Sequence, residues 1–147
     1  MNKMKQAGNV QQLITELLSL VEISTVFVLR MDFALMPDMK IPQPYNLNLG
    51  HAPVNLTIRD NEILVVVGFA IDGIANDQPL FSGHFDYQIV FKHDNPSRIK
   101  EILEIDEVRS FFCGAQADKI VWSYLRNAVH QILLDAGLPS VVIPLYR

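Results

Sequence analysis

The residues that could carry out chemistry are scattered along the chain. Two histidines four residues apart on a helix would let both rings reach one zinc ion, and no pair among the four histidines has that spacing. His84 and Asp86 share one face of a predicted strand, where a carboxylate can orient an imidazole, but two solvated residues on an exposed sheet face are the simpler interpretation. We predict no metal site and no cofactor.

Nucleophilic and phosphate-binding patterns are equally sparse. Cys113 follows Phe111 and Phe112, which indicates a buried thiol with a raised pKa and little reactivity. The Ser82-Gly83 pair lacks the flanking glycine of a nucleophile elbow, and no glycine-rich loop opens a helix. The acidic residues Glu101, Glu104, Asp106 and Glu107 are offset by Lys100 and Arg109 on either side of them, as on a solvated helix face. We therefore predict that the protein is not an enzyme.

Composition limits the partners further. The chain has 147 residues, enough for one domain that buries about 70% of its unfolded surface. It is 50% hydrophobic and only 19% charged, and we expect part of this apolar excess to be buried between subunits. A net charge of −4 argues against nucleic acid and anionic membranes. The single Cys113 fits a reducing compartment, so we predict the cytoplasm.

Hydrophobic periodicity predicts an α+β fold. A 3.6-residue repeat behind Asn9 predicts an amphipathic helix over residues 9–22. Alternation then predicts a half-buried strand from Thr25 to Leu35, strands over 47–58 and 63–71, and a further strand from Pro79 to residue 92. With no crossover helix between them, four antiparallel strands in sequence order, a meander, are the simplest sheet.

The second half of the chain predicts helices and an apolar tail. Short helices follow Pro96 and Ile105, and a long one runs from Asp118, as its cap, to Gly137. Apolar residues cover about half its circumference, enough for two neighbours. Beyond Gly137 the chain is apolar and contains prolines, so we expect an extended arm that packs in a groove.

Several stretches resemble the SecB protein-export chaperones: ILVVVGFAI in the third strand, CGA before the long helix, IVWSYLRNAV within it and GLPSVVIPLY after it. The resemblance covers residues 25–146. It implies one SecB-like domain over 1–147, with an extra N-terminal helix (1–24), an antiparallel sheet (25–93), a helical part (96–137) and an apolar arm (138–147). SecB-like proteins are homotetramers that hold unfolded polypeptide in apolar grooves without consuming nucleotide.

The resemblance therefore implies an oligomeric, ATP-independent holdase. By position, the client-binding groove is expected at Tyr45, Phe81, Trp122, Leu138, Val141, Val142, Ile143, Leu145 and Tyr146. For each of these residues, a place in the core or in a subunit interface is the equal alternative. Family members dock the SecA motor through acidic residues on the sheet, for which Asp72 and Asp77 are the candidates here, and the extra helix is in keeping with relatives that guard an antitoxin. The alternative is an oligomeric module that binds one dedicated partner.

Overall fold

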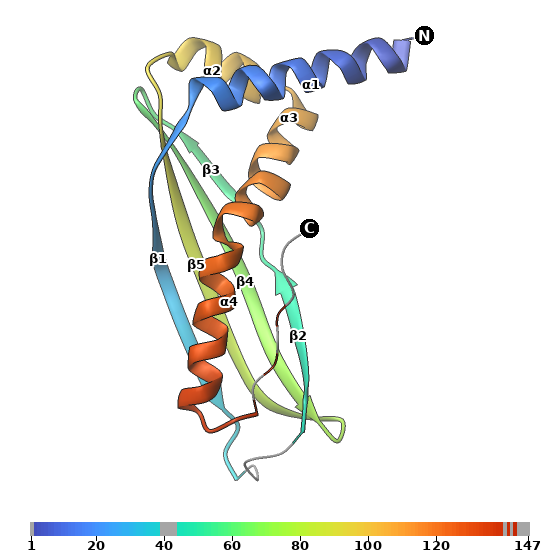
Figure 1. Ribbon diagram of the computed structural model, residues 1–147, viewed down its shortest axis with the longest axis vertical. Coiled ribbons are helices and arrows are strands. Elements are labelled where there is room, and N and C mark those ends of the chain that lie inside the picture. Colours follow the sequence, from blue (N-terminus) through green and yellow to red (C-terminus); the bar gives the residue numbers. More distant parts are fainter. Residues whose placement is uncertain (1, 39–43, 140, 142, 144–147) are drawn as a thin grey trace. The chain divides into compact units, whose positions relative to one another are not determined.

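The computed structural model describes residues 2–38, 44–139, 141 and 143. It confirms the predicted α+β class (Figure 1). The elements, in chain order, are α1 (Asn2–Leu20), β1 (Glu22–Leu35), β2 (Asn46–His51), β3 (Asn55–Ile58), β4 (Glu62–Ala75), β5 (Gln78–Lys92), α2 (Pro96–Leu103), α3 (Asp106–Phe111), a π-helical turn (Phe112–Gln116) and α4 (Ala117–Asp135).

The sheet corrects the predicted four-stranded meander. It has five strands in the order β1-β5-β4-β2, and β3 also pairs with β4. Thus β1 lies beside β5 instead of β2. Alternation shows which face a strand buries but not which strand lies next to it, so this order was not accessible from the pattern. The predicted strand over 47–58 is two strands because Pro53, which has no N–H, stands between them.

Strands β4 and β5 form a tight hairpin. Asn76 and Asp77 both have positive φ, 52° and 60°, as a two-residue type I′ turn requires. Asparagine and aspartate tolerate this conformation better than most side chains. Both strands alternate buried and partly exposed residues along most of their length, so β4 and β5 form the centre of the sheet.

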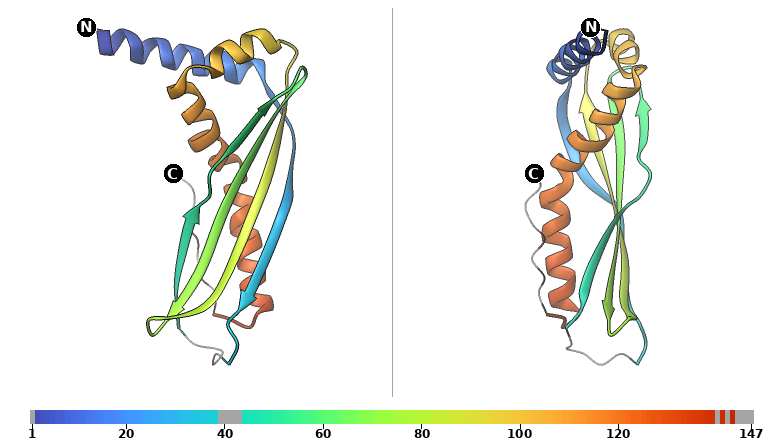
Figure 2. Two further views of the ribbon diagram at one scale, coloured as in Figure 1. Left: turned by 180° about the vertical axis from the view of Figure 1, so that it is seen from behind. Right: turned by 90° about the vertical axis from the view of Figure 1, so that its right-hand side faces the viewer.

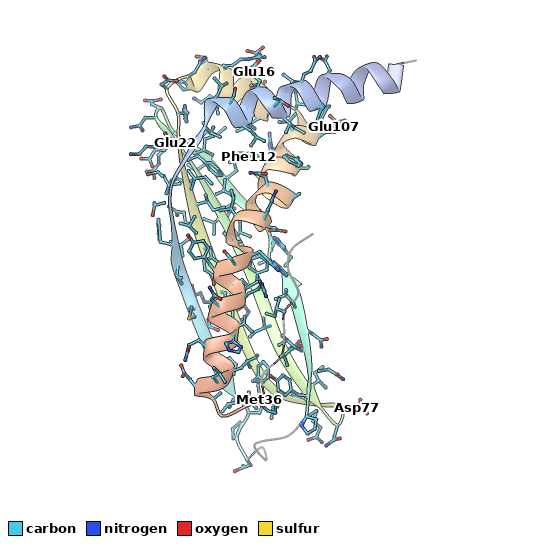
Figure 3. The ribbon with its side chains drawn as sticks, in the orientation of Figure 1. Glu16, Glu22, Met36, Asp77, Glu107 and Phe112 are labelled. Atoms are coloured by element: carbon cyan, nitrogen blue, oxygen red, sulfur yellow. The ribbon has the colours of Figure 1, made fainter. Side chains whose placement is uncertain are left out.

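The chain divides into two compact units, and both contain parts of β1, β4 and β5. Unit 1 comprises the chain up to Phe27 together with Val54–Val67 and Gln88–Asp118. Here the rings of Phe91 and Phe112 pack with centroids 4.8 Å apart; Phe112 is labelled in Figure 3.

An ion pair joins α1 to α2 in unit 1. The Arg98 guanidinium donates two hydrogen bonds to the Glu16 carboxylate, one of them from Nη2 at 2.8 Å. The observed α1 starts at Asn2, seven residues before the predicted start at Asn9, and ends at Leu20. Residues 2–8 are mostly good helix formers, so the helix extends beyond the amphipathic stripe that predicted it.

Unit 2 comprises the described parts of Val28–Pro53, Gly68–Tyr87 and the chain from Lys119 onward. In it α4 runs alongside one face of the sheet (Figure 2), with a fully buried stripe at Val121, Leu125, Val129 and Leu133. Gly137, at φ 75°, ends the helix, and the Leu138 N–H donates to the Leu133 carbonyl. Asp118 is not the predicted cap, because the π-helical turn leads directly into α4.

Candidate functional site

A cluster of three aromatic rings lies in unit 2 where the groove was predicted. Phe81 is fully buried, with its ring centroid 5.1 Å from that of Phe33 and 5.3 Å from that of Tyr45. The Tyr45 hydroxyl donates a hydrogen bond of 2.6 Å to the Pro139 carbonyl, and burial raises the pKa of this phenol. A Cβ added at Gly73 would lie 2.1 Å from the Phe81 ring, so the ring fits against bare backbone.

The described part of the C-terminal tail packs within the same unit. Leu138 and Ile143 are 4% and 8% exposed, and the Ile143 carbonyl accepts a hydrogen bond of 2.8 Å from Nε of Arg126 on α4. Val141 is half-buried. The tail thus covers part of unit 2. The predicted groove residues Val142, Leu145 and Tyr146 lie outside the described residues.

The groove residues predicted from the sequence therefore divide into two sets. Phe81, Leu138 and Ile143 are buried inside unit 2. Tyr45, Trp122 and Val141 remain partly exposed, and Trp122 meets Phe69 edge-on at 6.1 Å. The second set is the part of the predicted groove that solvent partly reaches.

A second exposed apolar surface is one that the sequence pattern did not identify. β1 was predicted to be half-buried, yet its large apolar side chains in unit 2 are exposed. We name this set the β1 strip: Val28, Leu29, Met31 and Leu35, each between 37% and 48% exposed. β1 is also an edge strand. Alternation correctly marked its apolar side chains, but it could not show that they stay exposed among the described residues.

The face of the sheet in unit 2 that lies opposite α4 contains a shallow trough. Its volume is about 420 Å³, and small residues such as Gly50, Ala70 and Ser82 line it together with Asp72. Asp72 is half-buried inside β4, whereas Asp77 is exposed in the β4–β5 turn (Figure 3). The two predicted docking acids therefore occupy different settings: a trough wall and a hairpin tip.

Three titratable side chains lie together beside this trough. His84 Nδ1 is 3.2 Å from Asp32 Oδ1, and Arg30 Nε donates to the other Asp32 oxygen at 2.7 Å. The hydrogen bond from His84, followed by the interactions with Arg30, holds the pKa of Asp32 below its usual range. His84 thus pairs across strands with Asp32, and the carboxylate considered from the sequence, Asp86, lies beside Gly68.

Groups that could carry out catalysis stay dispersed. Among residues 2–38, 44–139, 141 and 143, no group of three or more histidine, cysteine, aspartate or glutamate side chains could hold a metal ion. Burial raises the pKa of the Cys113 thiol, with the nearby Arg109 opposing the shift. In the part of the chain that the structure describes, no helix is both long and apolar enough to cross a bilayer.

Comparison with known proteins gives a match in structure alone. No protein-family model and no curated protein matches the sequence. Among solved structures, the chain resembles the SecB-like chaperone of Mycobacterium tuberculosis in complex with a ChAD peptide from the HigA1 antitoxin. The TM-score is 0.71, over 93% of this chain and 98% of that one. The fold of this chain is SecB-like. The sequence identity is 14%, so the likeness concerns the fold.

Proposed function

We propose that this chain is a SecB-like, ATP-independent holdase that binds non-native polypeptide through exposed apolar surface. The observation that carries the proposal is the β1 strip: large apolar side chains stay exposed along an edge strand, in a fold shared with a chaperone that was solved with a bound peptide. Contiguous exposed apolar surface on a protein of this size marks a site of interaction with other chains.

The physical mechanism is the burial of apolar side chains at several weak subsites. Each large side chain that a client buries contributes about 1.5–3 kcal/mol, and subsites that act together give avidity. Tyr45, Trp122 and Val141 provide partly exposed surface in unit 2. Phe81 packs against the Tyr45 ring as support, Leu138 and Ile143 are buried in the same unit, and the net charge of −4 keeps the unoccupied protein soluble.

We further propose that the functional form is a homo-oligomer. β1 has one unpaired edge and apolar side chains on both faces, so it can pair with a second copy and bury part of the strip. In this assembly Asp72 and Asp77 are available to dock a basic partner such as the SecA motor, and an antitoxin is a second candidate client. We assign this work to the cytoplasm.

Aggregation suppression tests the holdase proposal. The wild-type chain should suppress aggregation of several unrelated unfolded proteins at stoichiometric ratios without nucleotide. Trp122→Asp should weaken this protection, whereas Ser123→Asp, at an exposed neighbouring position on α4, should leave it unchanged. Protection of a single partner, with none of unrelated clients, would instead favour the dedicated binding module.

Light scattering tests the oligomer. Leu29→Glu places a charge in the β1 strip and should reduce the molar mass of the assembly, while Ser24→Glu, an exposed polar position on the same strand, is the matched control. A wild-type chain that is monomeric at all concentrations would contradict the proposal.

A further inference from the structure

Unit 1 contains a cavity that none of the predicted groove residues lines. Its volume is about 660 Å³. One wall is formed by Val54, Leu56 and Ile58, which share one face of the chain at and before β3. Leu103 and Cys113 line the helical side. The three residues on the β3 side are only half-buried. Solvent therefore reaches apolar side chains that line the cavity.

The strand that forms this wall has a free edge. β3 pairs antiparallel with β4, from Asn55 opposite Val66 to Ile58 opposite Ile63, and no other strand of the described residues pairs with it. Half of the backbone N–H and C=O groups of an edge strand point away from its neighbour. An extended peptide can therefore add to β3 and place alternate side chains over the cavity.

The helical rim of the cavity carries more positive than negative charge. Lys100, Arg109 and Glu104 line it. Lys100 is exposed and makes no ion pair with any residue that the structure describes. Arg109 Nε donates to the Leu103 carbonyl at 3.0 Å, which holds this guanidinium at the rim. A carboxylate on the incoming segment would meet both cations, whereas a basic segment would be repelled.

We infer that β3 receives an extended polypeptide segment as an added strand, with an apolar side chain in the cavity and an acidic side chain near Lys100 and Arg109. The inference rests on the proposed function and deepens it. It adds a second client subsite in unit 1 and gives that subsite a preference for sequences in which an acidic residue lies two positions from an apolar one, on the same face of the added strand.

Fluorescence anisotropy with a labelled peptide tests the subsite. The probe is an eight-residue peptide of alternating leucine and threonine in which one central leucine is replaced by glutamate, so that the carboxylate and the leucines lie on the same face of the strand. Leu56→Lys should weaken its binding at least about tenfold, because one large apolar contact is lost. Thr57→Lys, on the other face of β3, is the control and should change affinity less than about twofold. Circular dichroism verifies that both variants are folded.

Charge selectivity and thiol protection give two readouts that do not depend on Leu56. Lys100→Glu should weaken the glutamate peptide and leave a glutamine version of the same peptide unaffected. Saturating peptide should slow alkylation of Cys113 by N-ethylmaleimide, because the added strand covers the cavity. Unchanged binding in both Leu56→Lys and Lys100→Glu, or an unchanged alkylation rate at saturation, would overturn the inference.

The outcomes separate this inference from the holdase proposal. If the wild type suppresses aggregation but the peptide does not protect Cys113, the β3 subsite is wrong and the holdase stands. If the peptide binds at β3 but no client is protected from aggregation, the holdase is wrong and the peptide site stands. A fall in molar mass in Leu56→Lys would assign the cavity to a subunit interface and overturn the subsite.

Discussion

Replacing Phe81 by alanine tests whether this residue belongs to the protein core or to a client-binding groove. The two interpretations differ most at this residue. The ring is 0% exposed and lies between Phe33 and Tyr45. Removal of a buried phenylalanine costs about 3–5 kcal/mol. Gly73 has no side chain that could move into the space, so we expect the upper part of this range, about 4 kcal/mol or more. Such a change shifts the unfolding equilibrium by nearly 10³-fold.

Urea unfolding measures this loss. Trp122 is the single tryptophan and contacts Phe69 in the same unit, so its fluorescence reports on unit 2. The protein concentration must be the same for all variants, because assembly adds to apparent stability. Tyr124→Ala is the matched control. This ring is 49% exposed and 6.4 Å from Tyr87, and its loss should cost about 1 kcal/mol or less.

The opposite pattern would refute the reasoning. If Phe81→Ala unfolds at the wild-type urea midpoint but loses affinity for an unfolded client, the ring belongs to an open groove. The buried cluster described above would then be wrong, and the support assigned to Phe81 beneath the client surface would have to be withdrawn.

Three further predictions concern single contacts. Gly73→Ala should destabilise the protein, since the new methyl group would meet the Phe81 ring at 2.1 Å; a thermal midpoint equal to that of the wild type would contradict the packing. Tyr45→Phe removes one hydrogen bond to the tail and should cost about 0.5–1.5 kcal/mol in urea unfolding. Hydrogen bonding to Arg98 lowers the pKa of Glu16 below 4.5, so its contribution is present above pH 4.5 and is lost as the pH falls through the folded-state pKa. The thermal midpoints of wild type and Glu16→Gln should accordingly differ at neutral pH and converge in acid, and a difference that does not depend on pH would refute this pair.

The buried face and the end of α4 could be predicted because the sequence signals for them lie within a few neighbouring residues. The four-residue spacing of Val121, Leu125, Val129 and Leu133 predicted the buried face of α4, and all four are fully buried. Gly137 was predicted to end that helix, and its positive φ is the reason. Such features depend on the backbone geometry of a few neighbouring residues, so a single sequence suffices to identify them.

The order of the strands and the exposure of the β1 side chains depend on residues far apart in the sequence. Neither was predicted correctly. Nothing in the alternation of Phe27, Leu29 and Met31 indicates that β1 pairs with β5, or that its side chains stay exposed. The partner of His84 was missed for the same reason: Asp32 lies far away in the sequence. The β3 cavity also escaped notice, because its two walls come together only in the folded chain.

The pairing of β1 with β5 affects how the polypeptide is made. During translation β1 leaves the ribosome first, and β2, β3 and β4 must all be synthesised before its neighbour appears. At a translation rate of about 5–20 residues per second, the apolar strand β1 of the nascent chain remains without its partner strand β5 for seconds. A protein proposed to protect other unfolded chains would itself expose an unpaired apolar strand while it is being synthesised. Its own nascent form would be one of the first clients it meets.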